Sequence, residues 1–157
     1  MPKYLLKKSF SSSTLHETIA SFTNSFKLLI ETSPQGYFSS KEKIAKILPL
    51  PINESEWINK YLIFSTIKGM IRKNKLVDVA KSGTRELRET GKLSIKLKEK
   101  DVLIGVDVAQ NTQDIMLSTT DGKCLRFPVK SLRLFSGLNS GGVRGIKLEK
   151  NNIVVSL

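Results

Sequence analysis

The residues whose types and spacing could bind a ligand lie in "GLNSGGVRGIKL" (137–148), which holds four glycines and two cations. Gly137 and Gly142 have the G-x-x-x-x-G spacing of a phosphate-binding loop. Such a loop continues with a Lys that reaches the β/γ-phosphates and a Ser or Thr that holds Mg²⁺. Val143 and Arg144 stand there instead, and no G-x-G-x-x-G dinucleotide motif is present. The glycines therefore predict tight turns and close backbone packing rather than a nucleotide pocket.

Catalytic and metal chemistry find little support elsewhere. His16 is the only histidine and has no Cys, His or Asp cluster at metal-ligand spacing. Cys124 is the only cysteine and aligns with the apolar Ile71 in a repeat of the chain, which predicts a packed thiol. Trp57 and Phe127 are expected to fill core rather than to stack on bases. The sequence thus predicts no catalytic residue, no metal and no cofactor.

The charge points to a polyanionic partner. Lys and Arg number 26 against 14 acids, which gives a net charge of +12 and a pI near 9.9. The net charge is +3 over 1–60, +5 over 61–110 and +4 over 111–157, so no single tail carries it. Nucleic acid is favoured because each neutralised phosphate releases counterions. A lysine-rich solvated surface and an acidic protein or lipid partner stay open.

The composition fits a globular protein inside a cell. Hydrophobic residues make up 39%, and no apolar run approaches the roughly 18 residues of a membrane span. The start of the chain lacks the apolar stretch of a secretory signal. A single cysteine cannot form an internal disulfide, which favours a reducing cytoplasm.

A repeat of about 50 residues organises the chain. "LIFSTIKGMIRKNKL" (62–76) matches "IMLSTTDGKCLRFPV" (115–129) at an offset of 53, and "GKLSIKLKEKDVLIGV" (91–106) matches "GVRGIKLEKNNIVVSL" (142–157) at an offset of 51. Lys73 then aligns with Arg126, and Gly69 with Gly122. Since both halves match in the same order, two copies of one unit are expected.

A weaker copy is expected before these two. It aligns on Thr23 with Thr66, which places Phe26 at the turn glycine and Ile30 at the recurring cation. "KIL" (46–48) would take the place of the later "IKL". This copy would therefore be apolar where the others are basic.

The units are expected to be β-structured and to form blades. Short runs rich in Val, Ile, Leu and Phe alternate with turn signals, and Asp121-Gly122 suits a tight hairpin. All-β units of this size in series indicate propeller blades, with a sandwich as the alternative. The expected organisation is an N-terminal extension (1–13), a degenerate blade (14–60) and two blades (61–110 and 111–157).

These motifs carry a resemblance to a known family. "DIMLSTTDGKCLRFPVKSLR" followed by "GGVRGIKL" resembles a blade of the C-terminal domain of the DNA gyrase A protein. "YLIFSTIKGMIRKNKL" with "GKLSIKLKEKDVLIGV" resembles the blade before it. The resemblance implies about three blades of a β-pinwheel, an incomplete ring, whose basic rim binds duplex DNA in an ATP-dependent type IIA topoisomerase that introduces negative supercoils. It also implies a bacterial cytoplasmic, nucleoid-associated protein with no membrane association. The implied partners are double-stranded DNA, the breakage-reunion part of gyrase A and the gyrase B protein.

The resemblance assigns roles to two sets of residues. Cations expected to hold the DNA backbone without reading sequence are Lys68, Arg72, Lys73, Lys75, Lys123, Arg126, Lys130, Arg133 and Arg144. Glycines expected at turns and close contacts are Gly69, Gly91, Gly122, Gly137, Gly141, Gly142 and Gly145. Plain solvation is the alternative for each cation. Because Lys73 and Arg126 recur, their joint replacement is expected to flatten the salt dependence of binding by about two units.

The sequence also departs from the family. The "QRRGGKG"-type box needed for wrapping is absent, and none of Tyr4, Tyr37 or Tyr61 lies in the Arg-Tyr-Thr setting of a cleaving tyrosine. The chain is therefore expected to bind DNA without wrapping it, and to have no catalytic activity of its own. Three alternatives stay open: a fragment of the topoisomerase IV A protein, a propeller-like module for an acidic protein partner, and a decaying gene remnant.

Overall fold

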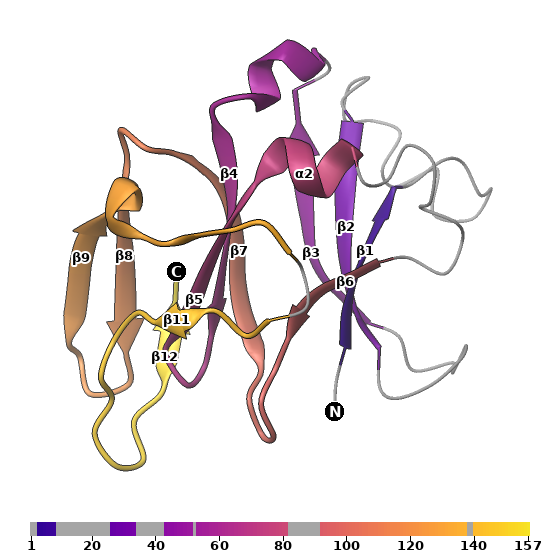
Figure 1. Ribbon diagram of the computed structural model, residues 1–157. Coiled ribbons are helices and arrows are strands. Elements are labelled where there is room, and N and C mark those ends of the chain that lie inside the picture. Colours follow the sequence, from indigo (N-terminus) through magenta and orange to yellow (C-terminus); the bar gives the residue numbers. More distant parts are fainter. Residues whose placement is uncertain (1–2, 9–25, 34–42, 52, 82–91, 138–139) are drawn as a thin grey trace.

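Three sheets stand in series in the computed structural model (Figure 1), which describes residues 3–8, 26–33, 43–51, 53–81, 92–137 and 140–157. Nearly all strand pairs are antiparallel, and the described helices are short. The sheets do not close on themselves. The expectation of an all-β chain of blades in an incomplete ring is confirmed.

The first sheet has the strand order β3-β2-β1-β6. Its strands are β1 (Lys3–Lys8), β2 (Phe26–Ser33), β3 (Lys43–Leu50) and β6 (Lys92–Lys96). Residues 3–8, which the sequence placed in an extension outside the blades, thus form a strand between β2 and β6. β6 comes from the next sequence unit, so this sheet already crosses a repeat boundary.

The second sheet has the order β10-β5-β4-β7, and β11 also pairs with β5. Its strands are β4 (Lys60–Thr66), β5 (Met70–Lys75), β7 (Leu103–Gln110), β10 (Leu134–Phe135) and β11 (Val143–Arg144). β10 and β11 follow each other along the outer edge of β5, at 73–74 and 70–71. They belong to the last sequence unit, so the second sheet is completed by the unit that follows it.

The third sheet has the order β12-β8-β9. Its strands are β8 (Asp114–Thr119), β9 (Cys124–Pro128) and β12 (Val154–Ser156). β3, β7 and β12 each lie at one end of their sheet, and β7 contacts both of the others (Figure 1). We call the side of the molecule formed by these three strands the inner side.

The ladder register reproduces the sequence repeat. Ile63 pairs with Lys73 in β4–β5, and Met116 pairs with Arg126 in β8–β9, at the expected offset of 53. The offset of 51 recurs in the backbone of the second half of each unit, where Lys100 and Asn151 are the two described non-glycine residues with positive φ. The two later units therefore have the same local structure.

The expected alignment of the first copy is wrong. Phe26 begins β2 and pairs with Leu50, so it does not occupy a hairpin turn. Thr32 pairs at the end of β2 as Thr66 does in β4, whereas Thr23 lies outside the described residues. "KIL" (46–48) lies in β3, which corresponds to β7 rather than to the edge segment that carries "IKL". The error arose because a degenerate copy offers few matching residues to fix a register.

The described helices are short and lie in connections next to strands. They are η1 (Glu54–Trp57) before β4, α2 (Leu76–Lys81) after β5 and η2 (Val129–Ser131) after β9. The sequence did not predict α2, whose buried Leu76 and Val79 lie three residues apart on one helix face. In the described part of the chain, no helix has the length and apolar character needed to cross a membrane.

Two hydrophobic clusters hold the sheets together. The first packs Leu62 and Phe64 of β4 against Leu48, Leu50 and residues around them, between the first and second sheets. The second joins the opposite face of the second sheet to the third sheet. Its buried members are Ile63, Ile71, Ile115, Leu117, Val129 and Val154. The second sheet is therefore covered on both faces.

Candidate nucleic-acid interface

The glycine-rich segment 140–148 lies along the outer edge of β5. Gly142 has φ +88°, and an added Cβ would collide with the carbonyl oxygen of Ile71. Gly145 lies so close to Ile71 that an added Cβ would stand 2.8 Å from its side chain, and the Gly145 N–H donates to the Gly69 carbonyl at 2.8 Å. These glycines let one backbone lie directly on another.

The remaining glycines singled out by the sequence differ in their surroundings. Gly69 and Gly122 both have positive φ, at the tips of the two equivalent hairpins. An added Cβ at Gly141 would lie 3.0 Å from the Lys96 carbonyl oxygen, and one at Gly137 would meet open space. Gly91 lies outside the described residues.

Arg72, expected to contact DNA, is buried in this structure. Its Nε donates to Asn74 Oδ1 at 2.7 Å, and its Nη1 donates to the backbone oxygen and to Oγ of Ser140. The guanidinium lies 5.1 Å from the Phe135 ring centroid. Burial lowers the pKa of Arg72 from its ordinary value. Its side chain links Phe135 and Ser140 to β5 and does not face solvent.

Lys73, the other cation singled out by its recurrence, is 4% exposed. Its Nζ donates to Val129 O at 2.9 Å and to Asn111 Oδ1 at 2.7 Å, and it lies 4.4 Å from the Tyr61 ring centroid. Loss of hydration on burial lowers the pKa of Lys73. Since a phosphate cannot reach a buried ammonium or guanidinium group, we remove Lys73 and Arg72 from the set of candidate DNA contacts.

Three of the other expected cations are exposed but already engaged. Lys68 Nζ donates to the Glu99 carbonyl at 2.7 Å. Lys123 forms ion pairs with Asp121 at 3.0 Å and with Glu149 at 2.5 Å. The hydrogen bond from its ammonium to Glu149, and to a smaller extent the one to Asp121, raises the pKa of Lys123. The third is the Arg126 guanidinium, whose Nη2 lies 2.6 Å from Asp114 Oδ2. Each would have to exchange a protein partner for a phosphate.

The remaining expected cations face solvent and are less engaged. Lys75, Lys130 and Arg144 are exposed, and their side chains have no hydrogen-bond or ion-pair partner among the described residues. Arg133 is exposed and lies 5.2 Å from the Phe135 ring centroid. Lys75 lies on β5 and Arg144 on β11, while Lys130 and Arg133 come just before β10; β10 and β11 both pair with the outer edge of β5.

Sequence reasoning missed two further cations on this rim, Lys96 and Lys147. They are the central residues of the two "IKL" matches, so their recurrence at an offset of 51 could have identified them. Ile95 and Leu97 are buried while Lys96 is exposed, as strand alternation requires. The Lys96 N–H lies 3.5 Å from the Ser140 carbonyl, so β6 and the glycine-rich segment form one continuous edge. We call the exposed cations near this edge whose side chains form no hydrogen bond or ion pair with the described residues the rim cations: Lys75, Lys96, Lys130, Arg133, Arg144 and Lys147.

A buried carboxylate holds one hairpin tip. Asp101 is 2% exposed and accepts hydrogen bonds from Thr66 Oγ1 at 2.9 Å and from the Lys68 N–H at 3.1 Å. In the third sheet, Thr119 Oγ1 instead donates to Asp121 within the hairpin itself. That bond, followed by those from Lys123, lowers the pKa of Asp121.

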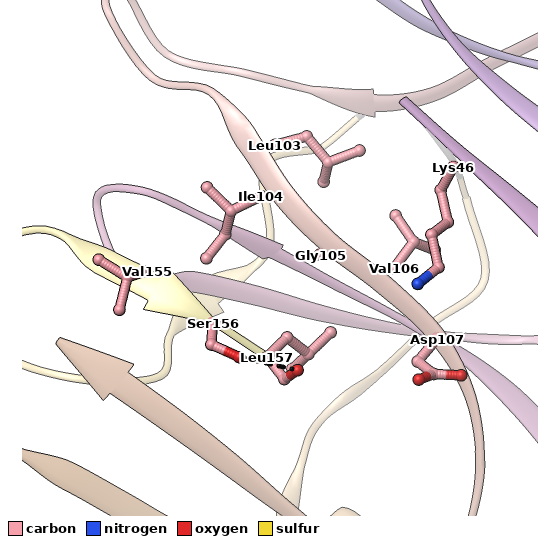
Figure 2. Close-up of a pocket in the computed structure, with 9 residues that line it drawn as sticks. All are labelled: Lys46, Leu103, Ile104, Gly105, Val106, Asp107, Val155, Ser156 and Leu157. Atoms are coloured by element: carbon pink, nitrogen blue, oxygen red, sulfur yellow. Dashed lines mark hydrogen bonds between the residues drawn. The ribbon is translucent and has the colours of Figure 1, made fainter. Parts of the chain in front are cut away.

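A hollow of about 150 Å³ lies on the inner side, between β7 and β12 (Figure 2). Apolar residues of β7 and β12 line it together with the polar residues Lys46, Asp107 and Ser156. Gly105 is needed here because an added Cβ would lie 2.6 Å from Leu157 Cβ. The hollow marks the meeting of two inner strands and does not adjoin the rim cations. Within the described ranges, no group of three or more His, Cys, Asp or Glu residues could hold a metal.

Comparisons with known proteins identify similar chains. The model of the family described as "DNA gyrase C-terminal domain, beta-propeller" matches residues 60–110 and 113–157. The DNA gyrase A protein of Rickettsia bellii is 42% identical over 116 residues, 74% of this chain, and that of Lawsonia intracellularis is 32% identical over 162 residues, 94% of this chain. The chain spans 12% and 19% of the length of these two relatives.

Solved structures share the fold. A C-terminal domain of DNA topoisomerase IV superposes with a TM-score of 0.64 at 20% identity, over 99% of this chain and 46% of that one. A DNA gyrase A C-terminal domain superposes with a TM-score of 0.61 at 17% identity, over 98% of this chain and 46% of that one.

Proposed function

Because this chain belongs to the DNA gyrase C-terminal domain family, we propose that it binds duplex DNA through the rim cations. The observation that carries the proposal is a run of exposed cations, most of them free of protein partners, along one continuous outer edge. Lys and Arg there can bind phosphates, with Arg donating two parallel hydrogen bonds and Lys acting as a point charge. Such contacts hold the DNA backbone and do not read its sequence.

We place this activity within DNA topology control. The curated relatives named above are gyrase A proteins, so the DNA-binding unit would serve negative supercoiling as a non-catalytic part of an ATP-dependent topoisomerase. The breakage-reunion part of gyrase A and the gyrase B protein would be its protein partners, in a bacterial cytoplasm. A topoisomerase IV fragment is the alternative, because a C-terminal domain of that enzyme has the same fold, with a TM-score of 0.64.

The test measures affinity for mixed-sequence duplexes as a function of salt. Each phosphate contact contributes about −0.9 to the slope of log K against log salt. The triple variant Lys96→Gln, Arg144→Gln and Lys147→Gln should flatten the slope by roughly 2.7 units if all three touch phosphate. The matched control removes cations that already have partners, through Lys68→Gln, Lys123→Gln and Arg126→Gln.

The control should change the slope less than the rim variant does. Equal slopes for the wild type and the rim variant would refute the proposed interface. Strong preference for one duplex sequence over the others would refute backbone recognition.

We also propose that a single copy binds DNA without wrapping it. Bending a site of 20–30 base pairs by 40–90° costs of order 1–6 kcal/mol, which contacts along the arc must repay. Three sheets offer about half the arc of a solved domain, since the chain covers 46% of it. Relaxed plasmid closed by ligase with monomeric protein should keep its linking number, and a clear shift would contradict the proposal.

A further inference from the structure

The second sheet contains a buried polar pair that the third sheet lacks. Arg72 and Asn74 of β5 are both 0% exposed, and Arg72 Nε donates to Asn74 Oδ1 at 2.7 Å. At an offset of 53 the third sheet has Leu125 and Phe127 instead. Burying polar groups is costly, and apolar residues form the same strand in the other unit. The pair in β5 therefore serves a feature of the second sheet alone.

That feature is Phe135, which the pair holds on the outer edge of β5. Phe135 pairs with Asn74 in the parallel β10–β5 ladder, and its carbonyl oxygen accepts a hydrogen bond from Asn74 Nδ2 at 2.7 Å. The Arg72 guanidinium lies over the Phe135 ring, 5.1 Å from its centroid. Both the backbone and the ring of Phe135 are thus held by groups that are themselves buried.

The same ring contacts Arg133, one of the rim cations. Arg133 Cζ lies over the Phe135 ring, 5.2 Å from its centroid, which is within the range of a cation–π contact. Arg133 precedes Phe135 by two residues, and side chains two apart in an extended chain point to the same side. Within the described part of the chain, Arg133 is the rim cation whose head group lies on an aromatic ring.

The ring contact leaves the hydrogen-bond donors of Arg133 unused. The N–H bonds of a guanidinium point outward in its plane, and a ring beneath Cζ does not occupy them. Arg133 is exposed and forms no hydrogen bond or ion pair with the described residues. It can therefore donate two parallel hydrogen bonds to a phosphate while it keeps the ring. A side chain held in this way also loses less conformational freedom on binding than an unrestrained one.

We propose that Phe135 is a positioning residue for DNA binding, which holds the Arg133 guanidinium ready for a backbone phosphate. Arg72 and Asn74 act one step further back, by holding Phe135. This inference rests on the proposed DNA interface and names the residue that orders one of its cations. Arg72, which the sequence assigned to DNA directly, then acts on DNA through Phe135.

The experiment is a double-mutant cycle on the affinity of the full chain for a mixed-sequence duplex. Phe135→Leu should weaken binding about two- to fivefold, which corresponds to the strength of an exposed cation–π contact. The loss should vanish when Arg133→Gln is already present and persist when Lys147→Gln is present instead. A purely structural role of Phe135 would lower the affinity by the same factor in all three backgrounds. Phe135→Tyr, which keeps a ring, should restore most of the affinity.

The contact can also be observed without DNA. Protons above an aromatic ring resonate upfield in NMR spectra, so the Cδ protons of Arg133 should move downfield in Phe135→Leu. Leu134→Ala is the matched control, because Leu134 lies in the same strand, is 42% exposed and carries no ring. It should leave the Arg133 resonances unchanged. Phe135→Met is a second ringless variant, should Phe135→Leu not fold.

Failure of this inference and failure of the DNA interface give different results. If the triple rim variant flattens the salt slope while Phe135→Leu is neutral or equally harmful in each background, the interface stands and the positioning role is overturned. Arg133 resonances that do not respond to loss of the ring also overturn it. If neither the triple rim variant nor Arg133→Gln alters binding, the interface and the positioning role both fail.

Discussion

The β4–β5 hairpin is covered on both faces and along its outer edge, whereas the described residues cover only one face of the β8–β9 hairpin. The two hairpins have the same register and the same tip geometry, with Gly69 and Gly122 both at positive φ. Yet Lys73 is buried and Arg126 is exposed. The cation at this repeat position forms a buried hydrogen bond between two sheets in the first hairpin and is solvated in the second. Whether the cation is buried depends on whether another sheet packs against that face of the hairpin.

The largest effect expected from this comparison is at the glycines. Gly142→Ala should destabilise the fold by about 3 kcal/mol or more. The alanine would have to adopt the positive φ of Gly142, and its Cβ would collide with the Ile71 carbonyl. Gly122→Ala meets open space and should cost only the backbone term, about 1–2 kcal/mol. Urea unfolding of both variants measures the difference. Equal losses would mean that β11 is not seated on β5.

The paired cations should differ next most. Lys73→Met leaves the Val129 carbonyl and the Asn111 side chain without their donor, at a cost of about 1–3 kcal/mol. Arg126→Met removes an exposed ion pair, which is worth below about 1 kcal/mol. Both are measured by urea midpoint. If Arg126→Met proved the more damaging variant in the monomer, the assignment of buried and exposed roles would be reversed.

Lys73 also gives the comparison a pH dependence. Burial lowers its pKa in the folded state, so between that value and the ordinary lysine value of about 10.4 the unfolded chain binds the extra proton. Stability should therefore rise with pH in this alkaline window for the wild type relative to Lys73→Met. A difference between the two proteins that stays constant with pH in that range would contradict the lowered pKa.

The smallest effect is expected at the tip of the exposed hairpin. Hydrogen bonds from Thr119 and then Lys123 lower the folded-state pKa of Asp121. Its stabilising contribution is therefore present above the ordinary Asp value of about 3.9 and is lost as the pH falls through the lowered value. Asp121→Asn should shift the urea midpoint slightly at neutral pH and not at strongly acidic pH. A shift that grew on acidification would have the wrong sign.

Local features of the fold could be predicted because they depend on nearby residues. Turn glycines, alternating apolar residues and the offsets of 53 and 51 predicted two equivalent β-units, and the strand registers carry the same offsets. The alignment of the first copy was wrong for two reasons. In the first sheet β1 holds the place that β5 holds in the second sheet, yet it comes before β2 in the chain, whereas β5 follows β4. In addition, few matching residues fix its register. The helix α2 was missed because six residues give too short a pattern.

By itself, the sequence determined the all-β character, the repeat and the excess of positive charge. Turn residues and the alternation of apolar residues act locally, and the net charge is a sum over the residues. Only the tertiary structure decided which cations face solvent. Arg72 and Lys73 are buried because Val129, Phe135 and Ser140, about 60 positions later in the chain, pack against β5. Lys96 and Lys147 are exposed because their apolar neighbours in "IKL" pack inward. Burial depends on contacts between distant segments, which spacing along one unit does not contain.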